Sequence, residues 1–179
     1  MSLVMTGGLG PVSVPYAAAN RELRQLAERL QSRVEGRFSW WYFSRPTIDC
    51  VHQGFRCRVF GMNQLWAGKT NTSVSCIVEL PKRTAFRLRM ESAALVSTNF
   101  FANLESSPAI PRSNLAADAL ARVLPKSLQQ ALGRLDLPYQ LVLNHDRITF
   151  TAFSLCAHDF YLRVLDILTE MARQLLESE

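Results

Sequence analysis

Cysteine and histidine residues cluster in the first half of the chain and raise the question of metal binding. Cys50, His52 and Cys57 lie within one short stretch, and Cys76 follows. Thiolates and imidazoles are the ligands that zinc prefers, but the spacing lacks the paired C-x2-C units of structural zinc sites. The cysteines also alternate with polar residues, as inward-facing strand residues do. We therefore expect small, reduced core residues, and we predict no metal and no other cofactor.

Nucleophilic catalysis requires groups that the sequence does not place together. A reactive thiol needs a base, an orienting group and an oxyanion hole, and no third group stands beside Cys50 and His52. Roles at a turn tip and at a helix start account for His145 and His158. The Ala-Gly-Lys-Thr stretch at 67–70 resembles the end of a phosphate-binding loop, but it lacks the earlier glycine and a strand follows it. We predict no catalytic residue and a protein that is not an enzyme.

Basic side chains alternate with apolar ones in two segments, which places them on the sheet face opposite the core. Guanidinium groups bind phosphates and carboxylates through paired hydrogen bonds, so this face predicts an anionic ligand, a nucleic acid or a protein partner. Asp49 and Glu79 neutralise part of the charge, and Phe60 is the main aromatic side chain available for base stacking. A solvated or helix-covered face is the alternative. The predicted binding residues are Arg56, Arg58, Lys82, Arg83, Arg87 and Arg89.

Trp66 and Leu65 form a second candidate contact. We expect them in a loop over residues 61–71 between two strands. An apolar pair at a loop tip is typical of an interface anchor or a membrane-surface contact. The alternative is that both side chains fold back over the core.

Two hairpins are predicted to position these residues. Alternation over 48–59 with a turn at Gln53-Gly54 sets Cys50 opposite Cys57 and Asp49 opposite Arg58. A second hairpin is expected to join 72–80 to 84–90. A three-residue turn, Pro81-Lys82-Arg83, sets Val78 opposite Phe86 there, so that both strands keep their apolar residues on one face.

Helices and a further hairpin account for the rest. Asn20 is a candidate N-cap for a helix to Val34, a strand is expected at 38–43, and helical patterns cover 115–123 and 125–135. Residues 139–152 predict a hairpin with a His145-Asp146 turn.

In that hairpin Leu143 faces Ile148 and Leu141 faces Phe150. A long amphipathic helix follows from Asp159. Because the strands cluster instead of alternating with helices, we predict an α+β fold: an antiparallel sheet, made of a four-strand meander plus the C-terminal hairpin, packed with three main helices.

The composition favours one small domain. The chain has 179 residues and a net charge of +5, which divides into +8 over residues 1–90 and −3 over 91–179. We expect residues 1–17 to be a flexible lead-in and 18–179 to form a single α+β domain. No apolar run reaches membrane-spanning length, and because residues 1–16 lack a basic start and a continuous apolar stretch we expect no secretory signal. Reduced cysteines favour the cytoplasm.

Two resemblances bear on function. Residues 118–153, with Leu-Pro-Lys-Ser-Leu at 124–128 and the last hairpin, resemble uncharacterised bacterial α+β domains that often accompany a membrane segment. The order of helix, meander, helix, hairpin and helix is similar to that of type III secretion chaperones, although those are typically small and acidic. The resemblance implies a bacterial protein that holds an effector polypeptide.

We therefore predict a non-enzymatic binding or adaptor domain with a protein partner, and we keep several alternatives. These are a secretion-chaperone-like protein, a small-molecule or lipid carrier, and an uncharacterised enzyme. If the protein is a carrier, we expect an apolar cavity beneath the sheet. A homodimer is a further open alternative.

Overall fold

The computed structural model describes residues 13–38, 45–66, 69–92, 112–125, 132 and 137–177. The helices and strands follow in the order α1 (Ser13–Arg29), β1 (Val34–Glu35), β2 (Thr47–His52), β3 (Phe55–Trp66), β4 (Lys69–Glu79), β5 (Leu88–Glu91), β6 (Arg112–Ser113), α3 (Ala117–Val123), β7 (Tyr139–Asn144), β8 (Arg147–Ala152) and α5 (His158–Glu177).

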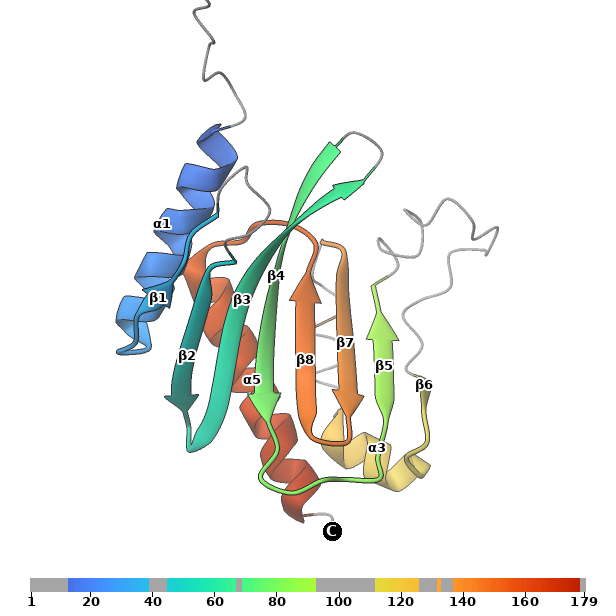
Figure 1. Ribbon diagram of the computed structural model, residues 1–179. Coiled ribbons are helices and arrows are strands. Elements are labelled where there is room, and N and C mark those ends of the chain that lie inside the picture. The colour runs from blue at the N-terminus through green and yellow to red at the C-terminus, as the bar shows by residue number, and fades with distance from the viewer. Residues whose placement is uncertain are drawn as a thin grey trace, which may run out of the picture.

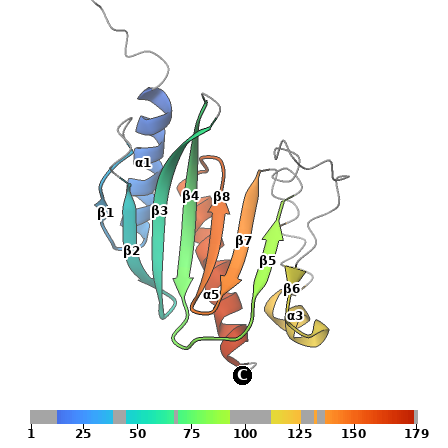
Figure 2. The ribbon, with the colours of Figure 1, turned by 45° about the vertical axis from the view of Figure 1, so that its right-hand side comes forward.

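The strands form one antiparallel sheet in the order β1-β2-β3-β4-β8-β7-β5-β6. Helix α5 runs behind the sheet and contacts α1, α3 and the central strands, so the described helices share one side (Figure 1). Figure 2 shows the same separation after a 45° turn. We call the opposite side, which no described helix covers, the open face. The predicted α+β class is confirmed.

Both hairpins that depend on local turns are confirmed. Cys50 lies opposite Cys57 and Asp49 opposite Arg58 in the β2–β3 pair. The β7–β8 pair sets Leu143 opposite Ile148. In each hairpin a short polar turn joins two alternating segments, and this combination determines the register within the segment itself.

The hairpin predicted between residues 72–80 and 84–90 is wrong. Val78 of β4 lies opposite Ile148 of β8, not Phe86, and Leu88 of β5 lies opposite Leu143 of β7. The β7–β8 hairpin is therefore inserted between β4 and β5. Its inner face is apolar along both strands, and insertion gives both of its edges a hydrogen-bonded neighbour. A four-strand antiparallel run, β1 to β4, and a C-terminal hairpin are nevertheless present.

The first helix starts earlier than predicted. Helix α1 begins at Ser13 and ends at Arg29, so Asn20 is not its N-cap. The Asn20 amide instead accepts a hydrogen bond from the backbone N–H of Phe38 (2.7 Å) and donates one to its carbonyl (3.1 Å). These bonds hold the Phe38 ring over Gly61, where a Cβ would lie 2.0 Å from the ring. Glycine at position 61 therefore makes room for this helix-to-strand connection.

Helix α5 forms the core together with the sheet. It begins at His158, one residue before the predicted start. The predicted apolar stripe is buried: Tyr161, Val164, Leu165, Leu168, Met171, Ala172 and Leu175. Burying a large aliphatic or aromatic side chain contributes about 1.5–3 kcal/mol, so this stripe holds the helix on the sheet. Within the described chain, no helix combines the length and the apolar composition that crossing a bilayer requires.

The start of α5 is tied to α1. The Glu22 carboxylate accepts a hydrogen bond from the backbone N–H of His158 (2.9 Å) and lies 3.0 Å from its ring Nδ1. A carboxylate at this position satisfies a free N–H of the first helical turn and complements the positive end of the helix dipole. These contacts lower the pKa of Glu22. The predicted strand at 38–43 and the predicted helix over 125–135 lie largely outside the described residues.

Candidate functional site

The open face carries rows of side chains that cross the sheet. One row contains Arg58 of β3 and Arg89 of β5, joined through Ile77, Thr149 and Val142 on the strands between them. At a spacing of about 4.8 Å between neighbouring strands, these two arginines are roughly 19 Å apart. Arg58 and Arg89 therefore lie far apart on the open face, because β4, β8 and β7 separate them.

Arg58 and Arg89 are each paired with a carboxylate. The Nε of Arg58 donates to Asp49 Oδ1 at 2.6 Å. Arg89 donates from Nε and Nη2 to Glu91 Oε1 at 3.0 and 2.6 Å. Gln140 also donates to Glu91, and these hydrogen bonds, with that of Arg89 the strongest, lower the pKa of Glu91. Their partners neutralise both arginines, which weakens them as binding groups for an external anion.

The remaining predicted cations gather at one end of the sheet. The segment after β4 carries Lys82, Arg83 and Arg87, and it passes the β7–β8 turn at the bottom of Figure 1. Backbone hydrogen bonds fasten the two together, from Leu80 N to Asp146 O (2.8 Å) and from Thr84 N to His145 O (2.7 Å). Arg56 stands at the same end, on β3 beside the β2–β3 turn.

Arg147 belongs to this group as well, and we name the set of Arg56, Lys82, Arg83, Arg87 and Arg147 the basic end. Arg147 starts β8 and lies opposite Glu79 of β4. It donates two hydrogen bonds to Asp146, each 2.9 Å long. The hydrogen bond from Arg147, together with the nearby charge of Arg83, lowers the pKa of Asp146. Glu79 and Asp146 therefore offset part of the charge, and the basic end remains net positive.

Arg87 is held in place by the turn that it faces. Its Nη2 lies 2.7 Å from Nε2 of His145, whose Nδ1 lies 2.9 Å from the carbonyl of Thr84. The Arg87 backbone N–H donates to Asn114 Oδ1 at 2.6 Å. These contacts fix the position of a charged group on a connection outside the strands, which lowers the entropic cost of binding a partner.

Shallow hollows flank the basic end. One, of about 430 Å³, is lined by Arg83, Asn144, His145, Asp146 and Arg147. Another, of about 580 Å³, lies between the β2–β3 turn and the end of β4 and includes Arg56, Glu79 and Leu80. Both are open to solvent and are lined in part by arginines, so an acidic side chain entering either hollow would meet a guanidinium donor.

An exposed apolar side chain lies next to these cations. Val51 of β2 stands directly opposite Arg56 on the open face and is 68% exposed. Within the described residues it is the large hydrophobic side chain that solvent reaches most fully. Arg112 on β6, opposite Arg89, is a further cation on this face.

Neither Arg147 nor Val51 was among the predicted binding residues. The signal for Arg147 is its position next to the inward-facing Ile148, which puts it on the outer side of the β7–β8 hairpin. Its neighbours across the sheet depend on the β4–β8 pairing, which no local pattern shows. Val51 was visible as an outward residue of β2, and its position opposite Arg56 follows from the confirmed register of that hairpin.

Leu65 and Trp66 lie in a strand, not in the predicted loop. β3 extends to Trp66 and pairs with β4, which sets Leu65 opposite Thr70 and Trp66 opposite Lys69. The prediction of a loop over 61–71 is wrong, because β3 and β4 remain paired up to Trp66 and Lys69. The side chains of Leu65 and Trp66 lie outside the described part of the structure, so their predicted anchoring role stays a prediction.

The cysteines have the surroundings of core residues. Cys76 is fully buried, and burial raises its pKa. Cys57 is 3% exposed, and its interaction with the Cys50 thiol and its burial raise its pKa as well. A raised pKa keeps a thiol protonated and weakly nucleophilic at neutral pH. The His52 ring contacts Asp166 of α5, with Nε2 2.8 Å from Oδ1.

No protein-family model matches the chain, and no curated protein matches its sequence. A solved structure with a similar fold is the mycobacterial trehalose monomycolate transport factor A, TtfA. The superposition covers 88% of this chain and 94% of that chain, with a TM-score of 0.60 and 10% sequence identity. At this identity the similarity concerns the fold alone: the sheet with its helices on one side is an architecture that this chain shares with TtfA.

Proposed function

We propose that this protein is a non-enzymatic binding domain and that the basic end of its sheet receives acidic groups of a protein partner. The observation that carries the proposal is the gathering of Arg56, Lys82, Arg83, Arg87 and Arg147 at one end of the sheet. The segments that bring them together are far apart in the sequence. Backbone hydrogen bonds hold the two segments that carry most of them against each other.

The charge pattern favours a protein over a nucleic acid. A nucleic acid requires a continuous positive track for its phosphates, whereas Glu79 and Asp146 interrupt the cations here. Base stacking requires exposed aromatic rings, and Phe55 and Phe60 are both partly buried. Mixed charges around an exposed Val51 fit the rim and the apolar centre of a protein interface.

The fold comparison supports a binding role. TtfA is named as a transport factor, and a role in holding or passing on another molecule needs an accessible surface instead of a catalytic pocket. The raised pKa values of the buried Cys57 and Cys76 make these two thiols weak nucleophiles. The hydrogen bond with Cys57 lowers the pKa of Cys50, so the proposal rests on the surface and not on the cysteines.

Fluorescence anisotropy with defined probes tests the proposal. The probes are a labelled 20-residue peptide of glutamates with interspersed leucines and an oligo-dT carrying the same number of charges. We expect the peptide to bind more tightly than the oligo-dT, and its affinity to fall at least about tenfold between 50 and 300 mM salt, since exposed charges are screened over about 10 Å or less. Tighter binding of oligo-dT would overturn the choice of a protein partner. Absence of binding to both probes would overturn the proposal itself.

A further inference from the structure

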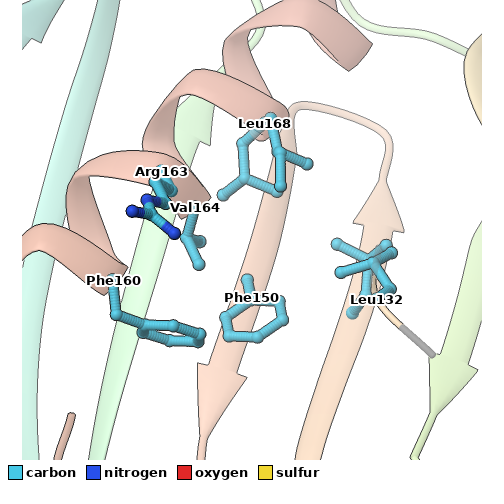
Figure 3. A pocket seen from close by; sticks show the side chains of 8 residues that line it. Leu132, Phe150, Phe160, Arg163, Val164 and Leu168 are labelled. Atoms are coloured by element: carbon cyan, nitrogen blue, oxygen red, sulfur yellow. The ribbon is translucent and has the colours of Figure 1, made fainter. Parts of the chain in front are cut away.

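A small apolar cavity lies on the helix side of the sheet, away from the basic end. It has a volume of about 200 Å³ and lies between α5 and the β7–β8 hairpin. The described residues that line it are Leu132, Leu141, Phe150, Phe160, Arg163, Val164, Ile167 and Leu168. Figure 3 shows Phe160, Val164 and Leu168 extending from α5 toward Phe150, with Leu132 on the opposite side. Protein interiors leave few voids larger than a water molecule, so a space of this size is unusual.

The walls make the cavity unsuitable for water. Leu132, Leu141, Phe150, Val164 and Leu168 are at most 3% exposed and carry no polar side-chain atom. A buried water needs two to four polar partners, and a cavity without them stays dry and binds apolar molecules instead. An aromatic pair forms part of the wall, with the rings of Phe150 and Phe160 6.1 Å apart and tilted by 56°. The cavity therefore selects an apolar group.

One charged side chain stands at the rim. Arg163 lines the cavity while its side chain remains exposed to solvent, and its neighbours in the lining are apolar. Among the described residues the guanidinium has no hydrogen-bond or ion-pair partner, and Asp159, one turn earlier on α5, contacts His158. An unpaired guanidinium beside an apolar cavity is complementary to a molecule with an apolar tail and an anionic head.

We propose that this cavity binds the tail of a single-chain fatty acid and that Arg163 pairs with its carboxylate. A cavity of about 150 Å³ with similar walls holds one benzene molecule. By proportion, 200 Å³ has room for a tail of on the order of eight carbons. The proposal does not depend on the basic end, because the two sites share no residue and lie on different parts of the molecule.

Titration of the full-length protein with carboxylates of increasing length tests the size of the site. We expect affinity to rise about fourfold for each added methylene, which corresponds to about 0.8 kcal/mol, up to about octanoate, and then to level off. Isothermal titration calorimetry measures the affinity for each carboxylate. A continued rise through dodecanoate would show adsorption to an exposed surface, and a lack of length dependence would show that no apolar cavity takes part. Either result would overturn the proposal.

Two variants test the location. Arg163→Gln removes the charge at an exposed position, so we expect octanoate to bind about fivefold more weakly and octanol to bind as before. Arg24→Gln, on the exposed side of α1, is the matched control and should change neither. Equal weakening of octanoate and octanol by Arg163→Gln would contradict pairing with the carboxylate.

Val164→Phe fills the cavity and should abolish octanoate binding in a protein whose circular dichroism is unchanged. If this variant does not fold, methyl NMR of the unaltered protein shows where octanoate binds. Octanoate must then shift the methyl signals of Leu132, Val164 and Leu168 before others. Shifts confined to other residues would place the ligand elsewhere and overturn the proposal.

Discussion

The Nη2 atom of Arg87 lies 2.7 Å from Nε2 of His145, and this contact determines which nitrogen of the ring carries hydrogen. An arginine guanidinium only donates hydrogen bonds, so Nε2 must accept. The carbonyl of Thr84, 2.9 Å from Nδ1, only accepts, so Nδ1 must donate. His145 is therefore a neutral imidazole with its hydrogen on Nδ1, and it orients one cation of the basic end.

The tautomer of His145 gives the first prediction. We expect ¹⁵N NMR of the protein at pH 8 to show an Nδ1 signal typical of a protonated ring nitrogen and an Nε2 signal typical of an unprotonated one. Arg87→Met removes the donor and should move the His145 signals toward the mixture of tautomers found in free histidine. A hydrogen on Nε2 in the unaltered protein would contradict the described contact.

Local patterns predicted the parts of this fold that local interactions determine. The β2–β3 and β7–β8 registers follow from alternation and from turns within each segment. The path of β4 could not be predicted in this way. The apolar and polar residues of β4 would match those of 84–90 as well as those of 147–152. The pairing that forms, with β8, joins residues more than 65 positions apart in the sequence, such as Val78 and Ile148. To choose between these two partners of β4, one must compare how much apolar surface the whole sheet buries in each arrangement.

The candidate site could be predicted only in part, because it too depends on long-range strand pairing. Residue types and alternation identified Arg56, Lys82, Arg83 and Arg87 as outward cations. Their gathering with Arg147 depends on the β4–β8 pairing and on the path of the 80–87 segment. The pairing of Arg58 with Asp49 was expected from the register of β2 and β3 and is present.

The ion contact at the start of α5 predicts a pH dependence of stability. The pKa of Glu22 is lowered from 4.5, chiefly by its side-chain hydrogen bond with His158. A lowered folded-state pKa contributes stability above the unfolded-state pKa, and that stability is lost as the pH falls through the folded-state value. We expect Glu22→Gln to cost about 1–2 kcal/mol at pH 7, and the difference from the unaltered protein to shrink below about pH 4.5.

Urea denaturation at several pH values measures this difference. Glu28→Gln replaces an exposed carboxylate on the same helix and serves as the control. A cost for Glu22→Gln that stays constant from pH 7 to pH 3 would show that the carboxylate charge does not contribute.

Two buried tyrosines predict opposite effects of the same substitution. The Tyr139 hydroxyl is buried and has no hydrogen-bond partner among the described residues. The Tyr161 hydroxyl accepts a hydrogen bond from the backbone N–H of Cys156 at 3.0 Å. An unsatisfied buried polar group costs about 1–3 kcal/mol. Tyr139→Phe should therefore raise the free energy of unfolding by about 1 kcal/mol, and Tyr161→Phe should lower it by about 1–2 kcal/mol.

Thermal and urea unfolding measure the free energy of unfolding of both variants. Each variant is the control for the other, because both retain the aromatic ring. Loss of stability in Tyr139→Phe would mean that its hydroxyl has a partner. In that case a buried polar contact would lie beside Phe150, whose ring stacks on Tyr139 at 5.3 Å.

The central claim is that the basic end, and not the whole open face, binds the partner. Arg56→Gln/Arg83→Gln and Arg58→Gln/Arg89→Gln remove the same charge from different places. Anisotropy with the acidic peptide at low salt compares them. We predict that the first pair of substitutions weakens binding about tenfold, while the second changes it less than about twofold, because Asp49 and Glu91 already neutralise Arg58 and Arg89. Equal losses in the two variants would contradict the claim.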